Sequence, residues 1–204
     1  MSQVLAADSY PSNAELIVAC RDLGYLRDEW YTLDPTYGRG TFWREWRPLR
    51  LSVHDIDPDK VPGGESIDFT NMGLYPDDFF DAVVFDGPYK LNGTPDGGVD
   101  ERYGVHEPTR WQDRMELIRD GITECVRVLK PGGFLLVKCQ DQVCSGKVRW
   151  QTRSFADHAE DLGCRLVDML HKIGGRPQPA GRRQVHARHN YSTMLILQKD
   201  RVRW

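Results

Sequence analysis

The fold class of this chain is decided by the stretch Tyr31-Thr32-Leu33-Asp34-Pro35-Thr36-Tyr37-Gly38-Arg39-Gly40-Thr41. Its pattern predicts a strand that begins near Trp30 and ends at Asp34, followed by a loop and a short helix. A Cβ atom at Gly38 or Gly40 would obstruct a ligand or forbid the required backbone angles, so this loop lets the backbone approach a ligand closely. A strand, a glycine-containing loop and a helix in this order are typical of open α/β sheets, which bind ligands beyond the carboxyl ends of their strands.

Segments on both sides of this stretch alternate between helix and strand patterns, which predicts a largely parallel sheet with helices on both faces. The run Ser12-Asn13-Ala14-Glu15 has the form of a capping box and predicts a first helix that ends near Gly24. Further strands are expected at residues 49–53, 67–69, 82–85, 134–137, 166–170 and 192–197, and further helices at 111–129 and 154–162. The stretch Lys130-Pro131-Gly132-Gly133 is expected to end the helix before it. We expect a single domain that spans residues 1–204.

The composition of the 204 residues is that of a globular protein, with 40% hydrophobic residues, 28% charged residues and a formal net charge of −3. No run approaches the roughly 18 apolar residues of a membrane helix, and the first residues lack the order of a secretory signal. We therefore expect a cytoplasmic protein without a membrane partner. The five cysteines are odd in number and include no Cys-x-x-Cys pair, which argues against a disulfide framework and a zinc site.

Four carboxylates, Asp34, Asp55, Asp68 and Asp86, lie at or near the expected carboxyl ends of strands, where open α/β sheets gather their ligands. Asp55 suits a ribose diol, whose two hydroxyls need acceptors. A nicotinamide dinucleotide fits less well, because its G-x-G-x-x-G/A fingerprint needs a small residue where this chain has Trp43. The pattern favours a mononucleotide-like cofactor, although two glycines so spaced also occur in plain tight turns.

These residues resemble motifs of the class I S-adenosylmethionine-dependent methyltransferases, and specifically of the amino-methyltransferases that act on DNA bases. Residues 33–41 are similar to the first motif, D-P-F-x-G-x-G-T, with Tyr37 in place of a small residue. His54-Asp55-Ile56-Asp57-Pro58 resembles the second motif, whose acid holds the ribose, and Asp68-Phe69 resembles the acidic position near the adenine, with Phe69 as a stacking partner. The resemblance implies S-adenosylmethionine as cofactor, held by Asp34, Pro35, Tyr37, Gly38, Gly40, Thr41, Asp55, Ile56, Asp68 and Phe69.

The resemblance extends from about residue 12 to residue 198. It implies a Rossmann-like α/β fold, in which a mostly parallel seven-stranded sheet has its last strand antiparallel and carries helices on both faces.

The stretch Asp86-Gly87-Pro88-Tyr89 follows a continuous apolar run and is the candidate catalytic site. An exocyclic amine is a poor nucleophile because its lone pair is delocalised into the ring. Two acceptors, a carboxylate oxygen of Asp86 and the carbonyl of Gly87, would favour a pyramidal nitrogen whose lone pair is free to attack a methyl group. Tyr89 would stack on a base extruded from the duplex, and Pro88 would shape the turn.

This stretch resembles the family's D/N/S-P-P-Y/F/W motif, with Gly87 in place of the first proline, so that the carbonyl is kept and the rigidity of proline is lost. Enzymes of this family that methylate cytosine N4 more often have Ser at the first position of the motif, and those that methylate a protein glutamine have Asn. Asp86 at this position therefore favours adenine N6 as the methylated group. Read alone, the four residues also fit an ordinary exit from a strand into a turn. No Pro-Cys dipeptide precedes Cys139, so a cytosine-C5 mechanism lacks its motif.

The segment from His171 to Asn190 contains five Lys or Arg residues and no acid, and can meet phosphates although the net charge is negative. We expect contacts to the substrate, DNA above all, from Lys90, Arg182, Arg183 and Arg188. The alternative is that Arg182, Arg183 and Arg188 belong to a solvated loop that makes no contact with a phosphate.

Sequence-specific members of the family carry an added target-recognition domain, and we expect none here. Recognition would then come from short loops, from a second copy of the chain in a homodimer, or from a partner subunit. Two alternatives to a DNA methyltransferase remain at this point: an enzyme that methylates RNA or a protein glutamine, and a weakly active or inactive module that binds the cofactor or DNA.

Overall fold

The computed structural model describes residues 8–63, 65–91, 110–174, 185–187 and 189–201. Its seven-stranded sheet has the order β1-β8-β9-β5-β4-β2-β3. The strands are β1 Ser9–Tyr10, β2 Tyr31–Asp34, β3 Arg50–Val53, β4 Phe80–Phe85, β5 Leu129–Cys139, β8 Cys164–Ile173 and β9 Tyr191–Lys199. Neighbouring strands are parallel except at β9, which is antiparallel to both β5 and β8. The mostly parallel sheet with an antiparallel last strand is therefore confirmed.

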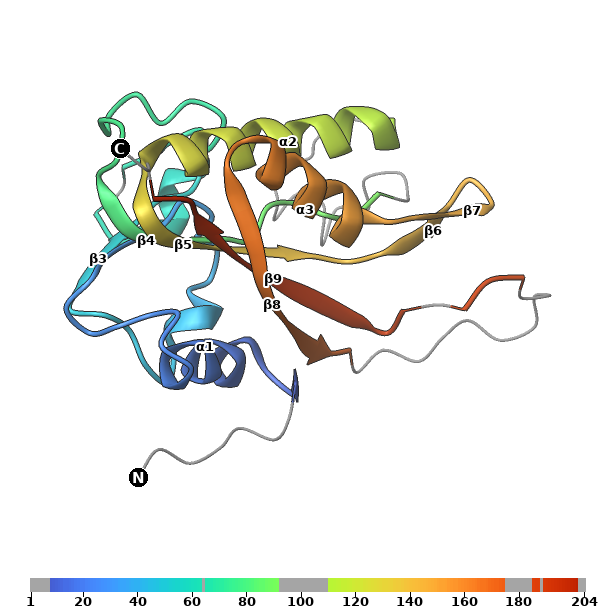
Figure 1. Cartoon of the computed structure of the whole chain (residues 1–204), viewed down its shortest axis with the longest axis horizontal. Helices are drawn as coiled ribbons and strands as arrows, with labels where there is room; N and C mark the ends of the chain where they lie inside the picture. Colours follow the sequence, from blue (N-terminus) through green and yellow to red (C-terminus); the bar gives the residue numbers. More distant parts are fainter. Residues whose placement is uncertain (1–7, 64, 92–109, 175–184, 188, 202–204) are drawn as a thin grey trace.

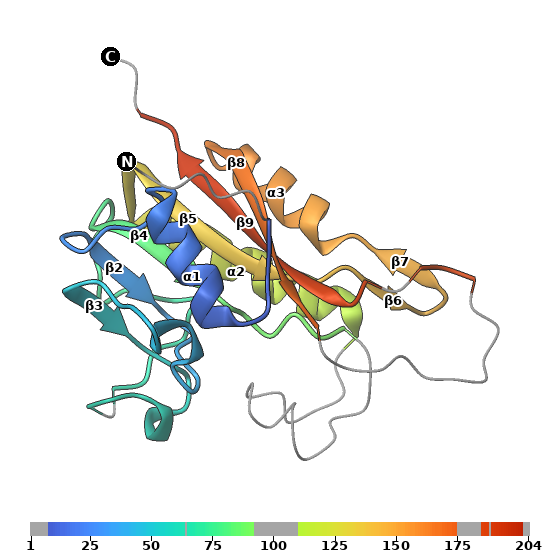
Figure 2. The ribbon, with the colours of Figure 1, turned by 90° about the horizontal axis from the view of Figure 1, so that it is seen from below.

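Helices cover both faces of the sheet, as predicted. Helix α1 (Asn13–Asp22) lies on one face, and α2 (Trp111–Val128) and α3 (Gln151–Asp161) lie on the other (Figure 1). From the α1 side the sheet runs from β3 at one edge to β8 near the other (Figure 2). Two 3₁₀ helices, η1 (Thr41–Trp43) and η2 (Pro58–Lys60), and a hairpin of β6 (Gln142–Cys144) and β7 (Lys147–Arg149) complete the described elements. None of the helices in the described part of the chain combines the length and the apolar character of a membrane-spanning segment.

The core has two layers, one on each face of the sheet. Val83 and Phe85 of β4 face α2 and α3, where they pack in the layer that includes Ile122. Ala82 and Val84 of the same strand pack in the layer that contains the apolar residues of α1. Because successive side chains of a strand point to opposite faces, a strand buried on both faces needs the continuous apolar run that the sequence shows here.

The first helix begins as the capping box predicts. The Ser12 hydroxyl accepts a hydrogen bond from the backbone N–H of Glu15 at 3.1 Å and donates to the Glu15 carboxylate at 3.0 Å. The stretch expected to end α2 instead lies within β5, because the helix already ends at Val128. A Cβ atom at Gly133 would lie 2.7 Å from the carbonyl oxygen of Asp81, so only glycine fits where this strand passes β4.

The strand expected at residues 67–69 is absent, and this part of the prediction was wrong. The described residues around it form only two isolated bridges, Asp55 with Ser66 and Asp68 with Asn71. Asp68 Oδ1 accepts hydrogen bonds from the backbone N–H and the hydroxyl of Thr70, at 2.8 and 2.7 Å. Such a local turn competes with pairing to a neighbouring strand. The seventh place in the sheet is taken by β1, which pairs with β8 at the opposite edge.

Candidate active site

Two of the predicted motifs meet where β2 and β4 end. Asp34 is the last residue of β2, and Asp86 follows the last residue of β4. The backbone N–H of Asp86 donates to the hydroxyl of Thr36 at 2.8 Å, which joins the loop after β2 to the stretch after β4. The structure thus brings the expected cofactor loop and the expected catalytic stretch together at one edge of the sheet, where such folds bind ligands.

The glycine loop is held in place by backbone contacts with the chain after β3. Gly38 and Gly40 have φ angles of +56° and +61°, which favour glycine. The N–H of Gly38 donates to Asp55 Oδ2 at 2.9 Å, and the N–H of Tyr37 donates to the carbonyl of His54 at 2.8 Å. A Cβ atom built on Gly40 would lie 2.5 Å from the Tyr37 hydroxyl, so the Tyr37 ring packs directly over this glycine.

Both carboxylate oxygens of Asp55 accept hydrogen bonds, one from the glycine loop and one from the turn after β3. Oδ1 accepts from the N–H of Asp57 at 3.0 Å, in addition to the contact between Oδ2 and Gly38. Lys60 Nζ lies 3.8 Å from Oδ1. In this structure the Asp55 carboxylate binds the glycine loop. It has further lone pairs that could accept from a ribose diol, and its contact with a cofactor stays a prediction.

Asp34 is a fully buried carboxyl group beneath the same loop. Its Oδ1 accepts from the N–H of Thr36 at 3.0 Å, and its Oδ2 accepts from the indole N–H of Trp43 at 2.7 Å. Burial raises the pKa of Asp34 to about 7, and the hydrogen bonds from Trp43 and Thr36 oppose that rise. Trp43 is itself buried and supports this carboxylate.

Asp86 has one oxygen paired and the other free among the described residues. Oδ2 lies 3.0 Å from the ammonium of Lys138, in an ion pair whose side chains are 14% and 5% exposed. Oδ1 is buried and has no hydrogen-bond partner within the described part of the chain. A buried carboxylate oxygen without a donor is costly, so this atom is suited to receive an N–H group from a ligand.

Gly87 fits its place for a steric reason. It is buried, and a Cβ atom there would lie 2.5 Å from Ile118 Cδ1 and 2.8 Å from Phe85 Cζ. The side chains of α2 and β4 therefore fill the space that proline would need. Close packing restrains the backbone at this position, so the absence of proline does not by itself leave the turn loose.

Two glutamines, the half-buried Gln142 and the buried Gln151, hold the backbone after the motif. Gln142 Nε2 and Gln151 Nε2 donate to the carbonyl of Tyr89 at 2.8 and 2.7 Å. The N–H of Leu91 donates to Gln142 Oε1 at 3.2 Å. Because Gln142 lies in β6 and Gln151 begins α3, both ends of the β6–β7 hairpin are tied to the candidate catalytic stretch.

Lys90, predicted to contact the substrate, directly follows this stretch. Its carbonyl accepts a hydrogen bond from Arg114 Nη1 at 2.6 Å. The other residues predicted for the substrate, Arg182, Arg183 and Arg188, lie outside the described residues.

The remaining predicted cofactor residues differ in exposure. Pro35 is buried, whereas Ile56 is 51% exposed. Thr41 accepts a hydrogen bond from Asn13 of α1. Phe69 packs against Phe85 with ring centroids 5.2 Å apart. Asp68 is exposed and makes the local turn described above, so it is not brought into contact with the glycine loop by any hydrogen bond among the described residues.

The sequence analysis did not identify Lys138, Gln142 or Gln151. Lys138 follows the apolar run Phe134–Val137 near the end of β5. A charged residue at the end of a buried strand is the sequence signal from which it could have been predicted. Its ammonium lies 5.4 Å from the ring centroid of Phe42 and 5.5 Å from that of Tyr89.

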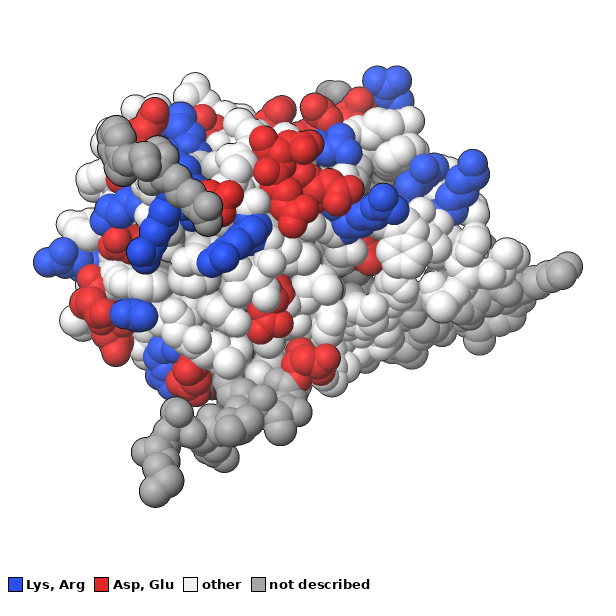
Figure 3. Space-filling view, in the orientation of Figure 1, with Lys and Arg blue, Asp and Glu red and all other residues white. Residues whose placement is uncertain are grey.

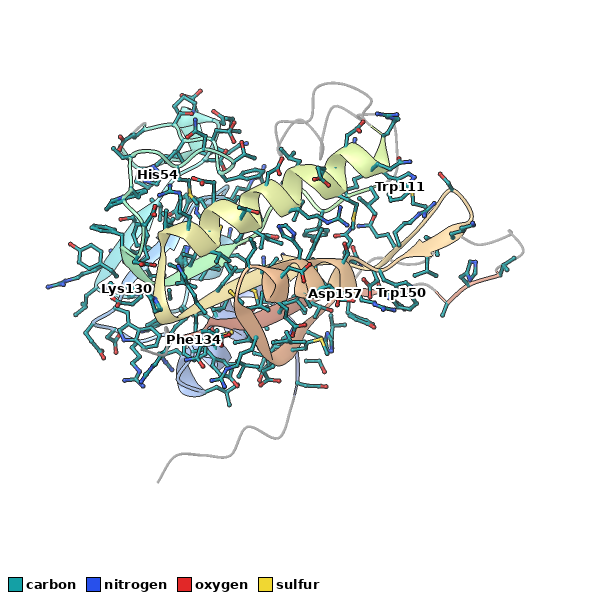
Figure 4. All side chains as sticks on the ribbon, turned by 45° about the horizontal axis from the view of Figure 1, so that its top comes forward. His54, Trp111, Lys130, Phe134, Trp150 and Asp157 are labelled. Carbon is teal, nitrogen blue, oxygen red and sulfur yellow. The ribbon has the colours of Figure 1, made fainter. Side chains whose placement is uncertain are left out.

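Aromatic and charged groups lie on the hairpin side of the site. Trp150, at the end of β7, is 52% exposed, and its ring centroid is 5.5 Å from that of His189, which stacks on Tyr191. Trp150 and Trp111 lie at the same end of the molecule (Figure 4), where Arg149 packs over the Trp111 ring at 3.8 Å. Acidic side chains gather over α3, and basic side chains lie beyond them towards the hairpin (Figure 3).

The described residues contain no group of three or more His, Cys, Asp or Glu side chains that could hold a metal ion. His54, labelled in Figure 4, pairs instead with the Tyr75 hydroxyl at 2.6 Å. All five cysteines are buried and free.

Comparison with known proteins finds similarity at the level of the fold. No family model and no curated protein matches the sequence. Among solved structures, TrmN from Thermus thermophilus is 16% identical, with a TM-score of 0.56 over 90% of this chain and 48% of that chain. A SAM-dependent methyltransferase from Methanosarcina mazei is 15% identical, with a TM-score of 0.54 over 88% of this chain and 96% of that chain. The [4+2]-cyclase SpnF is 15% identical, with a TM-score of 0.58 over 92% of this chain and 81% of that chain.

The chain spans about half the length of TrmN and of two further solved structures that it matches. Proteins of different stated activities share this architecture, and a fold alone does not determine an activity. The similarity to these structures extends over 88% to 92% of this chain, which includes most of its seven-stranded sheet and its helices. The chain has the Rossmann-like fold of the class I S-adenosylmethionine-dependent methyltransferases.

Proposed function

We propose that this protein transfers a methyl group from S-adenosylmethionine to an exocyclic amino group of a nucleic-acid base, with adenine N6 in DNA as the first candidate. The observation that carries the proposal is Asp86 Oδ1, a buried acceptor at the end of β4 beside the glycine loop that has no hydrogen-bond partner among the described residues. An acceptor in this place is suited to an N–H group of the substrate. The fold is consistent with this proposal and does not distinguish the substrate.

The residues beside Asp86 fit a nucleoside cofactor. Gly38 and Gly40 have positive φ angles, and within 4 Å of a Cβ built on Gly38 the nearest atom is the Thr36 carbonyl oxygen, at 3.8 Å. The backbone can therefore approach a ligand at Gly38. Asp55 places a carboxylate at the same loop, suitable for hydroxyl groups. We propose that this loop holds S-adenosylmethionine, which supplies an electrophilic methyl group when bound.

The chain's own residues would activate the amine by two hydrogen bonds. Asp86 Oδ1 accepts one N–H of the amino group, and the carbonyl of Gly87 accepts the other. Both contacts grow stronger as the nitrogen becomes pyramidal and positive, so they stabilise the transition state more than the ground state. The Tyr89 ring would stack on the base, and the two glutamines that bind the Tyr89 carbonyl keep that ring's backbone in place.

A nucleic-acid substrate is supported by the surroundings of the site. The β6–β7 hairpin carries Lys147 and Arg149 and leads into the half-exposed Trp150. Cations can meet phosphates, and an exposed indole can stack on a base. Target recognition by the hairpin, by a second copy of the chain or by a partner subunit is part of the same proposal.

The test is transfer of a labelled methyl group to separate pools of DNA, RNA and protein, followed by digestion and identification of the methylated product. We expect N6-methyladenine from DNA, and its loss in Asp86→Ala. Asp157→Ala, which changes an exposed carboxylate on α3, is the matched control and should behave as the wild type.

Label in RNA or in protein glutamine would replace DNA as the substrate. If the cofactor binds, no pool accepts label and Asp86→Ala changes nothing, the chain is a binding module and the proposed activity is wrong.

A further inference from the structure

Lys138 places a buried positive charge within the proposed site. Its side chain is 5% exposed, and its ammonium nitrogen lies 3.0 Å from Asp86 Oδ2. Burying a lone ammonium is costly, and removal of one partner from a buried ion pair leaves the other charge uncompensated. A lysine in this position therefore depends on Asp86, and Asp86 depends on the lysine.

The surroundings restrict where this ammonium can lie. The rings of Phe42 and Tyr89 lie 5.4 and 5.5 Å from it, within the range of cation–π attraction. Phe42 is in η1, directly after the glycine loop, and Tyr89 is in the proposed catalytic stretch. Lys138 thus bridges the cofactor loop, the stacking tyrosine and the acceptor carboxylate.

The pair gives the two oxygens of Asp86 different tasks. Oδ2 is committed to Lys138, while Oδ1 is the oxygen without a partner among the described residues. Among the described residues, Asp34 of β2 and Cys139 of β5 are titratable groups on which Asp86 acts, and its charge raises the pKa of both. Neither group brings a positive charge, whereas the ammonium of Lys138 lies in contact with the carboxylate.

We propose that Lys138 is a positioning residue, which holds Asp86 by its Oδ2 atom and so directs Oδ1 towards the amino group of the substrate. The identity of that amino group rests on the proposed function. The ion pair itself, and its effect on the charge of Asp86, can be measured without any substrate.

The first test compares Lys138→Met with Lys138→Arg, and uses as the control Lys130→Met, which breaks the more exposed ion pair with Asp81 at the other end of β5. Lys138→Met should lower kcat/KM on the order of 10²-fold, because a misplaced reacting group costs about that much. The acid limb of its pH profile should move to higher pH, because the carboxylate has lost its opposite charge. Lys138→Arg should restore most of the rate and the position of the acid limb. A lower rate with an unmoved acid limb in Lys138→Met would overturn the proposal.

The second test measures unfolding by urea between pH 5 and pH 8 and needs no activity. In Lys138→Met, the buried carboxylate of Asp86 has lost the opposite charge beside it, and its charged form is costly. Lys138→Met should therefore lose stability relative to the wild type as the pH rises and the carboxylate must carry its charge. The Asp86→Asn/Lys138→Met double variant carries neither charge of the pair, so it should not show this loss of stability with rising pH. A difference between wild type and Lys138→Met that stays constant with pH would overturn the proposal.

The Asp86→Asn/Lys138→Met double variant covers the case in which Lys138→Met does not fold. Recovery of folding in the double variant supports the pairing, because the uncompensated charge has been removed. A double variant that stays unfolded contradicts it, since charge burial would then not be the defect. If the wild type methylates no pool while the pH-dependent coupling is found, the proposed methyl transfer fails and the role of Lys138 towards Asp86 stands.

Discussion

The buried carboxyl of Asp34 should make the stability of this protein fall as the pH rises. Its folded-state pKa is about 7, raised by burial, whereas an aspartate in the unfolded chain titrates near 3.8. Such a group contributes its full stabilisation below the unfolded pKa and loses it as the pH rises through the folded pKa. A difference of about 3 pKa units corresponds to about 4 kcal/mol, of which about 2 to 3 kcal/mol should be lost between pH 5 and pH 8.

Asp34→Asn tests this magnitude, because asparagine cannot titrate. Urea unfolding at several pH values between 5 and 8 would give the free energy of unfolding of the wild type and of the variant. The variant should be less stable at pH 5, since its amide places an N–H where a carboxylate oxygen now accepts from Thr36 or Trp43. The difference between the two proteins should shrink as the pH rises. Asp157→Asn, on the exposed face of α3, should follow the wild type at every pH.

Parallel curves for the wild type and Asp34→Asn would refute this reasoning. They would mean that the folded-state pKa of Asp34 is close to its unfolded value, and that the hydrogen bonds to the carboxylate outweigh its burial. Other groups that titrate in this range are present in both proteins, so their contribution cancels in the difference.

Three further predictions concern the glycine loop, the glutamines that bind the Tyr89 carbonyl, and the first helix. Gly40→Ala should weaken cofactor binding, measured by calorimetry, more than Gly24→Ala does. Both glycines have positive φ angles, but a Cβ atom at Gly24 meets nothing within 4 Å, whereas one at Gly40 meets the ring of Tyr37. Gln151→Leu should lower kcat and leave cofactor affinity unchanged, because it removes one of two donors to the Tyr89 carbonyl; an equal loss of affinity would contradict the assignment. Ser12→Ala should lower the free energy of unfolding by about 1 kcal/mol in urea, through loss of the helix cap, and an unchanged midpoint would show that the cap contributes nothing.

The elements with long, regular patterns could be predicted from the sequence. The apolar run of β4 and the periodic apolar positions of α2 both formed as expected, because each signal extends over enough residues to be read locally. The short strand β1 has two residues and carries no pattern of its own, since pairing with β8 determines it. The β6–β7 turn had one local signal, the Ser145-Gly146 pair, whose φ angles are both positive.

The candidate site was predictable where its residues form contiguous motifs, and not where partners come from distant segments. Asp86 was found because it directly follows a buried strand. Lys138 lies 52 positions further along the chain, and Gln151 lies 62 positions after the tyrosine whose carbonyl it binds. These contacts exist only once β4 and β5 are paired and the hairpin has folded back. The weak strand at 67–69 failed for the opposite reason, because its own side chains stabilise a turn.

The position of β9 in the sheet has a consequence for biosynthesis. This strand, Tyr191–Lys199, lies between β5 and β8 and pairs with both, yet the ribosome makes it after every other described strand. Until it emerges, β5 and β8 each expose a row of unpaired backbone N–H and C=O groups, which can pair with other nascent chains. A ribosome that stalls before residue 191 would therefore release a chain with an open gap in the middle of its sheet, and quality control should degrade that product rather than tolerate it as a slightly shortened protein.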